Sequence, residues 1–438
     1  MSILLLSCNP DKDIFTPDPL FPDGLVSTSI SGQVVNIADL PVNGAWVSLG
    51  QNSIQTDDNG FFNFDNVEVN SLRTTLTVSK LGYFESGRAI IPSKESTSHL
   101  RIQILEKTEV ANFNGSTGGQ VDLPNGVILN IPDNAVIDQN GVGYSDEVLI
   151  SAYSLNPEIL EGLQKMPTDL KGINSDGNER LLESFGMFTF DWSDINQMKL
   201  SIVSGKKVEV RFPVANGLLA NAPNTIALWY FDGENWKEEG TATLENGMYV
   251  AQIEKSGFWN CSRPHEFVSV KGVLKNLNDA PLSNMPFSIE IVNGGVMGFG
   301  FIDVEGNIVA NVPKGQPSQI KVLDECNNID YSTMIGALNE DALISNIKIS
   351  NSSDFSHFKG TLLDCNFDIV QNGYIILSVN TKTYFFPISE GHLEVDVNAC
   401  NFSMATLVAY DVENQKQSEP LSLDIVANVE MGTINVCF

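Results

Sequence analysis

The feature that most restricts the fold of this chain is its series of short apolar runs, which turn-forming residues interrupt at close intervals. Runs rich in β-branched residues end at Gly, Asn, Asp or Pro, which favour turns. Examples are 34–35, 45–49, 72–78, 100–105 and 208–212. A helical period occurs at 157–165, where Pro157 is placed to begin a helix and Pro167 follows its end. Turns about every 8–12 residues with one short helix predict an all-β fold of antiparallel Ig-like or transthyretin-like sandwiches.

An internal repeat supports several similar units. Its copies open at Gly32, Gly272 and Gly360, and a first turn residue follows twelve positions later at Gly44, Asn284 and Asn372. A second turn glycine lies 28, 34 and 31 positions after the opening one, at Gly60, Gly306 and Gly391. Equal first spacing and drifting second spacing predict a fixed first hairpin followed by loops of variable length.

The length of 438 residues fits three or four domains of ordinary size. We predict four tandem sandwiches, at 28–107, 108–260, 261–351 and 352–438. A signal remnant at 1–8 and a Pro-rich tether at 9–27 precede them.

The N-terminus resembles the end of a bacterial lipoprotein signal peptide, in which an apolar run and a small residue precede a cysteine. Leu5, Leu6 and Ser7 precede Cys8 here. The resemblance implies lipidation of Cys8, a membrane anchor, and an outer-membrane envelope protein that faces the periplasm or the exterior. The basic region that normally opens such a signal is missing, which suggests a true start further upstream. The alternative is an ordinary apolar N-terminus with a chance cysteine.

The first repeat carries the motifs Gly32-Gln33-Val34, Pro41-Val42-Asn43-Gly44-Ala45, Thr56-Asp57-Asp58-Asn59-Gly60-Phe61 and Lys80-Leu81-Gly82-Tyr83. These resemble the carboxypeptidase regulatory-like domain, a transthyretin-like sandwich within the carbohydrate-binding-like fold group. The other two repeats keep the turns but lose the Thr-Asp pair. The resemblance implies a non-catalytic module, since this domain is the neighbour of a zinc peptidase and contains none of its chemistry.

The segment 108–260 carries different motifs. Gly118-Gly119-Gln120-Val121 and Ile131-Pro132-Asp133-Asn134-Ala135 resemble the opening of the sandwich shared by ankyrins and netrin receptors. Met166-Pro167-Thr168-Asp169-Leu170, Ser184-Phe185-Gly186-Met187 and Leu228-Trp229-Tyr230-Phe231 resemble cartilage intermediate layer protein and related extracellular proteins. Some relatives cleave themselves at a His-Phe-Ser sequence, but residues 256–260 contain no histidine, so self-cleavage is not expected.

The net charge of −29, from 54 acidic and 25 basic residues, argues against nucleic acid as a partner. The acids are scattered, as on a solvated surface; capture of a divalent cation or a cationic partner is the alternative.

The cysteines agree with export. None forms a Cys-x-x-Cys pair, so neither a zinc ribbon nor thioredoxin-like chemistry is expected. If the last sandwich has an odd number of strands, Cys365 and Cys437 lie at the same end and form a disulfide. Cys400 then faces the preceding domain, within reach of Cys326, and Cys261 is left over. Fifteen arrangements of two disulfides are open on the sequence alone.

Candidate ligand-binding side chains fall into three groups. The histidines, His99, His265, His357 and His392, show no metal-binding spacing and are predicted at surface or turn positions. Asp57, Asp58, Asn59 and Asp65 offer oxygen ligands for Ca²⁺, but a hairpin turn requires the same residue types. We therefore expect no metal, no cofactor and no catalytic residue.

The third group is aromatic: Trp229, Trp236 and Trp259. Strand alternation puts Trp229 and Phe231 on one face and Leu228 and Tyr230 on the other, which favours the core. The alternative is an exposed row of rings that stacks on a sugar.

We expect a non-catalytic cell-envelope lipoprotein that acts as an adhesion, ligand-binding or spacer module, because sandwiches in series present their loops away from a membrane. The alternative function is a surface glycan-binding protein of a polysaccharide-uptake or adhesion system. An enzyme would require a cleft with converging polar side chains.

Overall fold

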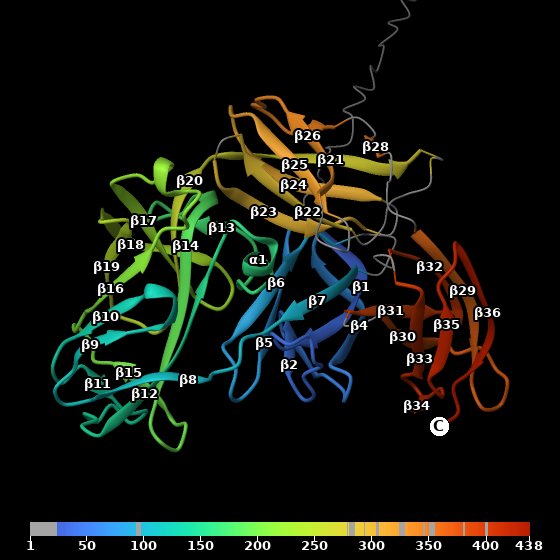
Figure 1. Cartoon of the computed structure of the whole chain (residues 1–438), viewed down its shortest axis with the longest axis horizontal. Helices are drawn as coiled ribbons and strands as arrows, with labels where there is room; N and C mark the ends of the chain where they lie inside the picture. The colour runs from blue at the N-terminus through green and yellow to red at the C-terminus, as the bar shows by residue number, and fades with distance from the viewer. Residues whose placement is uncertain are drawn as a thin grey trace, which may run out of the picture.

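The strands of this chain pair into four β-sandwiches, which we call the first to the fourth (Figure 1). The computed structural model describes residues 24–92, 98–277, 279, 285–292, 294–303, 306–323, 329–344, 347–349, 355–379, 382–398 and 402–438. Strands dominate these residues, and the predicted helix is present as α1 (Leu160–Gln164), shorter than the predicted 157–165. The prediction of tandem all-β sandwiches with one short helix is confirmed.

The first sandwich packs a sheet of order β4-β1-β7 on a sheet of order β3-β2-β5-β6. Its strands are β1 (Leu25–Val35), β2 (Trp46–Leu49), β3 (Asn52–Gln55), β4 (Phe61–Asn70), β5 (Thr74–Ser79), β6 (Ser86–Ile90) and β7 (Ser98–Gln103).

The second sandwich is one hydrogen-bonded sheet of 13 strands around a single core. Its strands are β8 (Glu109–Asn114), β9 (Gly119–Asp122), β10 (Ile128–Ile131), β11 (Val136–Ile137), β12 (Glu147–Leu155), β13 (Lys171–Ile173), β14 (Glu179–Ser193), β15 (Lys199–Ile202), β16 (Val208–Pro213), β17 (Thr225–Phe231), β18 (Trp236–Glu245), β19 (Met248–Ile253) and β20 (Gly257–His265). Two 3₁₀ turns, η1 (Pro124–Gly126) and η2 (Leu219–Asn221), complete it.

The third sandwich contains β21 (Phe267–Asn276), β22 (Pro286–Ile291), β23 (Val296–Phe301), β24 (Asn307–Pro313), β25 (Ser318–Leu323), β26 (Ile329–Ile335), β27 (Ala342–Leu343) and β28 (Ile347–Ile349). The fourth contains β29 (Phe355–Leu363), β30 (Asn372–Val379), β31 (Lys382–Ser389), β32 (His392–Asn398), β33 (Met404–Asp411), β34 (Lys416–Gln417), β35 (Leu421–Asp424) and β36 (Asn428–Asn435).

The strand topology confirms the internal repeat. In the first, third and fourth sandwiches the opening strand pairs antiparallel with the strand that follows the second turn glycine, and parallel with a strand near the end. The sets are β1 with β4 and β7, β21 with β24, β27 and β28, and β29 with β32 and β36. These parallel pairs depart from the purely antiparallel sheets that we predicted.

The second turn glycine has a backbone reason. Gly60, Gly306 and Gly391 have φ of +71°, +82° and +68°, a region that other residues enter only at a cost. A Cβ on Gly60 would also lie 2.3 Å from the carbonyl oxygen of Val34. The turn that the sequence predicts at this glycine is therefore present in each repeat.

Two predicted domain limits fall inside strands. β1 begins at Leu25, within the predicted tether 9–27, and β20 runs past the predicted boundary at 260 to His265. Glu266 alone separates β20 from β21. The second sandwich therefore passes into the third almost without a linker.

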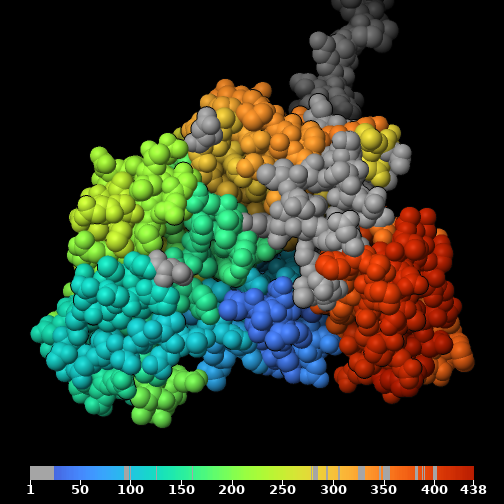
Figure 2. Space-filling view, in the orientation of Figure 1, coloured from blue at the N-terminus to red at the C-terminus, as the bar shows by residue number. Residues whose placement is uncertain are grey.

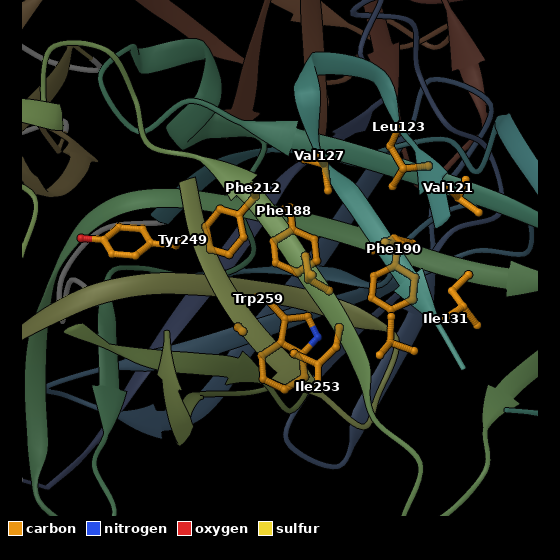
Figure 3. Close-up of a cluster of buried hydrophobic side chains, with 14 of the residues drawn as sticks. Val121, Leu123, Val127, Ile131, Phe188, Phe190, Phe212, Tyr249, Ile253 and Trp259 are labelled. Carbon is orange, nitrogen blue, oxygen red and sulfur yellow. The ribbon is translucent and has the colours of Figure 1, made fainter. Parts of the chain in front are cut away.

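The core of the second sandwich shows how its strands use their two faces. Ile226 and Leu228 of β17 lie in the main core. Figure 3 shows Phe188, Phe190 and Trp259 of the same core. Trp229 and Phe231, which alternate with them, lie in another apolar cluster on the opposite face. β17 is thus apolar on both sides.

That outer cluster joins three sandwiches. Phe84 and Leu105 come from the first sandwich, Leu163 and Met166 from α1 and the turn after it, and Val296 from the third. The first sandwich consequently lies between the second and the fourth, as Figure 2 also shows. The chain is folded back on itself and is not an extended row of domains.

Polar contacts reinforce the junction of the first two sandwiches. Arg73 donates from Nε and Nη2 to the two carboxylate oxygens of Asp169, at 3.0 and 2.9 Å. The amide of Thr168 donates to the carbonyl oxygen of Gly87 at 2.9 Å. The Met166–Leu170 motif therefore serves as a docking segment between domains.

Candidate functional site

The three predicted ligand tryptophans are buried. Trp229 and Trp236 are 0% exposed and Trp259 is 2% exposed. Each indole nitrogen donates to a backbone carbonyl oxygen: that of Ser262, Asp169 and Lys255, respectively. This placement contradicts the alternative of an exposed sugar platform at these residues, because core packing occupies both strand faces.

The Asp57 side chain of the acidic turn hydrogen-bonds to the backbone of the same turn. Oδ1 of Asp57 accepts the amides of Asn59 and Phe61 at 2.9 and 2.8 Å, as in an Asx turn. Asp65 lies further along β4 and accepts from Asn63. The described part of the chain holds no group of three or more His, Cys, Asp or Glu side chains arranged for a metal ion. The turn interpretation therefore accounts for these residues.

One predicted surface histidine is buried, at the junction of the second and third sandwiches. Nε2 of His265 lies 3.0 Å from Oε2 of Glu183, which Arg263 also contacts at 3.2 Å. The amide of Gly295 donates to the other carboxylate oxygen of Glu183 at 3.1 Å. Burial alone would raise the pKa of Glu183, but these hydrogen bonds and the charge of Arg263 lower it below its ordinary value.

Glu183 is 2% exposed and His265 is 8% exposed, so this pair faces no solvent cleft. It holds the β22–β23 hairpin of the third sandwich against β14, which explains the glycines there: a Cβ on Gly294 or Gly295 would press on the Glu183 side chain. The other histidines differ. His357 lies beside Asp396 and Glu394, His392 is exposed, and the side chain of His99 lies outside the described residues.

The described residues include only some of the cysteines for which pairings were predicted. Cys8, Cys326 and Cys400 lie outside the described residues. Cys261 is a buried free thiol whose pKa is raised by burial. Cys365 and Cys437 are adjacent because β29 and β36 run parallel, although the structure shows eight strands here and not the odd number that the parity argument assumed. The amide of Val436 donates to the carbonyl oxygen of Leu363, and contact with the Cys365 thiol, together with burial, raises the pKa of Cys437 to about 11. Both thiols are free here, so the disulfide stays a prediction.

The second sandwich contains a cleft of about 260 Å³ between β12, β14 and the η1 turn. By volume it has room for roughly nine water molecules, or one small ring. Four of its lining residues carry a hydroxyl group: Thr108, Tyr153, Ser154 and Thr189. The remaining wall is apolar: Val110, Leu123, Pro124, Val127, Ala152 and Phe188.

Thr189 is the unusual member of this wall. It is 0% exposed, and its Oγ1 finds no hydrogen-bond partner among the described residues. A buried hydroxyl without a partner costs about 1–3 kcal/mol, so native proteins seldom keep one without a use. Because this oxygen is closed off from solvent, a ligand in the cleft cannot reach it as the side chains stand.

The cleft is suited to binding more than to proton transfer. Tyr153 is its titratable group, and burial raises the pKa of the phenol, so it stays protonated at neutral pH. Hydroxyl groups on an otherwise apolar wall can hold a small ligand and set its orientation. Sequence reasoning missed this site because its walls come from segments about 80 residues apart.

Comparison with known proteins gives no family for the whole chain. No model of a known protein family matches it. Human cartilage intermediate layer protein 1 is 29% identical over 120 residues, which are 27% of this chain and 10% of that protein. The pig protein of the same name is 27% identical over 120 residues, 20% of its length. The chain therefore spans a fifth or less of these relatives, and the predicted resemblance is confirmed only over that stretch.

Solved structures of low identity also resemble it. The shaft pilin SpaA of Lactobacillus rhamnosus GG is 9% identical, with a TM-score of 0.22, over 39% of this chain and 98% of the pilin. The Bacillus anthracis TIE protein is 13% identical, with a TM-score of 0.18, over 75% of this chain and 51% of that protein.

Replacing Thr189 by valine should stabilise the free chain by about 1–2 kcal/mol, because it removes an unpaired buried hydroxyl at constant shape. Thr56→Val is the matched control. Thr56 is also buried, but its hydroxyl accepts from Ala45 and donates to Val42, so the change should cost about 1–3 kcal/mol. Urea unfolding followed by tryptophan fluorescence measures both, and a loss of stability in Thr189→Val would contradict this account.

Oxidation should join Cys365 to Cys437. Because the pKa of Cys437 is about 11, its thiolate is scarce at neutral pH, and the reaction should accelerate as the pH rises towards that value. Closing a loop of about 70 residues should stabilise the chain by about 4 kcal/mol. Peptide mapping identifies the bond, and Cys365→Ser is the control. Finding Cys437 joined to another cysteine, or unpaired after full oxidation, would refute the assignment.

Proposed function

We propose that this chain is a non-catalytic cell-envelope lipoprotein that binds a ligand, as an adhesion or ligand-capture module. The observation that carries the proposal is the cleft of the second sandwich, whose wall includes the half-buried, hydroxyl-bearing residues Tyr153 and Ser154. The apolar cluster shared by three sandwiches supports it, because a cleft wall held from both faces of the sheet is preorganised.

A spacer role is less well supported. A spacer gains length when its domains lie in a row, whereas here Phe61 of the first sandwich packs on Tyr374 of the fourth. Human cartilage intermediate layer protein 1 matches this chain over 10% of its own length, so the proposal does not draw on its role.

The second candidate is glycan capture. The hydroxyl-bearing residues Tyr153 and Ser154 beside an apolar wall match the two sides of a sugar, which carry hydroxyls and C–H groups. If this candidate is right, the sugar lies in the cleft and not on the tryptophans.

A binding array of glycans and matrix proteins, probed with the full chain, separates the two. Either ligand class should bind about tenfold more weakly to Ser154→Ala, because one hydrogen bond is lost, and equally well to Thr56→Val. A ligand that binds all three chains equally lies elsewhere and removes the cleft from the proposal. Binding to no glycan and no protein would argue against the function itself.

The anchor is a separate part of the proposal. No helix within the described residues is long and apolar enough to cross a membrane, and Cys8 lies outside them. Mass spectrometry of the chain from its own cells should find an N-terminal peptide that begins at Cys8 and carries lipid, and Cys8→Ala should leave the detergent phase. A peptide that runs through Ser7 into an unmodified Cys8 would show that the anchor is absent.

A further inference from the structure

The fourth sandwich carries three aromatic rings on the outside of its sheet. Ile375, Leu377 and Val379 of β30 point into the core, so Tyr374 lies on the opposite face. The strand register puts Tyr410 of β33 directly beside Tyr374, and Phe385 of β31 diagonally across from it. The Tyr374 ring lies 4.6 Å from that of Tyr410 and 4.7 Å from that of Phe385. We call these three residues the aromatic seat.

The turn at 57–61 of the first sandwich occupies this seat. The core cluster of the first sandwich contains Phe62 and Phe64 but not Phe61, which faces outward and yet is only 5% exposed. Its ring lies 4.5 Å from Tyr374 and 5.1 Å from Phe385. Two outward-facing aromatic surfaces of one chain thus bury each other.

Hydrogen bonds give this contact specificity. The Tyr374 hydroxyl donates to Oδ2 of Asp57 at 2.8 Å and accepts from Nδ2 of Asn59 at 2.9 Å. Tyr374 is 1% exposed, and burial, followed by the Asp57 charge, raises its pKa. The phenol therefore stays protonated. Its hydroxyl can donate to the carboxylate of Asp57 and accept from the side-chain amide of Asn59 at the same time.

Both surfaces are formed without help from each other. Oδ1 of Asp57 is held by the amides of Asn59 and Phe61, and Gln33 donates to the carbonyl oxygen of Asn59 at 2.9 Å. These bonds lie within the first sandwich. The seat is likewise built on paired strands of the fourth. Preformed surfaces lose little entropy on association, which favours recognition.

The fourth sandwich also differs from the others in how it is attached. In the described residues, its core cluster is composed of its own side chains alone, from 358 to 436. The first three sandwiches share a cluster that contains Phe84, Trp229 and Val296. Separating the turn from the seat would therefore leave every core intact, whereas separating the first three would not.

We propose that the aromatic seat and the 57–61 turn are a recognition pair that also joins the fourth sandwich of one copy to the first sandwich of a second copy. The two surfaces differ, so their contact is heterologous. Within one chain it closes the molecule, and between chains it produces exchanged dimers or head-to-tail assemblies. The inference is independent of the ligand that the cleft binds. The wild-type chain remains a closed monomer in dilute solution, because its own turn is present at a high effective concentration.

The test uses two full-length variants, each with one surface disabled. Phe61→Asp disables the turn and Phe385→Asp the seat, since each would bury an uncompensated carboxylate in the contact. Both side chains face out of their own sandwiches, so the sandwiches should still fold. In Phe61→Asp the seat is free, and in Phe385→Asp the turn is free. Each variant alone should sediment as a 47.8 kDa monomer.

Mixed together, the two variants should form a complex of twice that mass, in a proportion that increases with concentration. The chain that carries both substitutions offers neither surface and should not associate with either variant. If either aspartate variant loses the wild-type circular dichroism, Phe61→Ala and Phe385→Ala repeat the test with the rings removed and no added charge. A mixture that sediments as monomers at the highest soluble concentration, with both variants folded, would overturn the proposal.

Discussion

The two-sided nature of a β-strand decides how this molecule is assembled. Successive side chains point to opposite faces, so a strand such as β17 that is apolar on both faces needs a second apolar partner beyond its main core. Phe84 of the first sandwich and the residues around α1 supply that partner for Trp229 and Phe231. The outer face of β17 is therefore covered partly by its own domain and partly by its neighbours.

The sequence was most informative where structure depends on local chemistry. Positive φ at Gly60, Gly306 and Gly391 follows from the turn type, so the turns, the strands between them and the repeat could be predicted. The parallel pairing of β1 with β7 could not, because those strands are about 70 residues apart and nothing local encodes their contact. The helix was predicted because Pro157 and Pro167 bound it, although only 160–164 is helical.

Side-chain sites were predicted less well, for the same reason. Alternation showed that Trp229 and Leu228 lie on opposite faces, but not that the first sandwich covers the outer one. His265 was expected at the surface because its partners Glu183 and Gln316 are distant in sequence. The outward position of Tyr374 in the aromatic seat could have been predicted from the sequence. The alternate positions 375, 377 and 379 are apolar and face the core, so Tyr374 must face the other way.

The net charge of the chain influences whether the aromatic seat and the 57–61 turn meet within one copy or between two copies. A net charge of −29 makes two copies repel each other at long range, while the contact within one chain involves no approach of a second charged body. Salt screens that repulsion over a Debye length of about 8 Å at physiological strength, but it hardly affects rings in contact at 4.5–5.1 Å. The balance between the closed chain and contact between copies should thus move towards the latter as salt rises, although the contact itself is largely apolar.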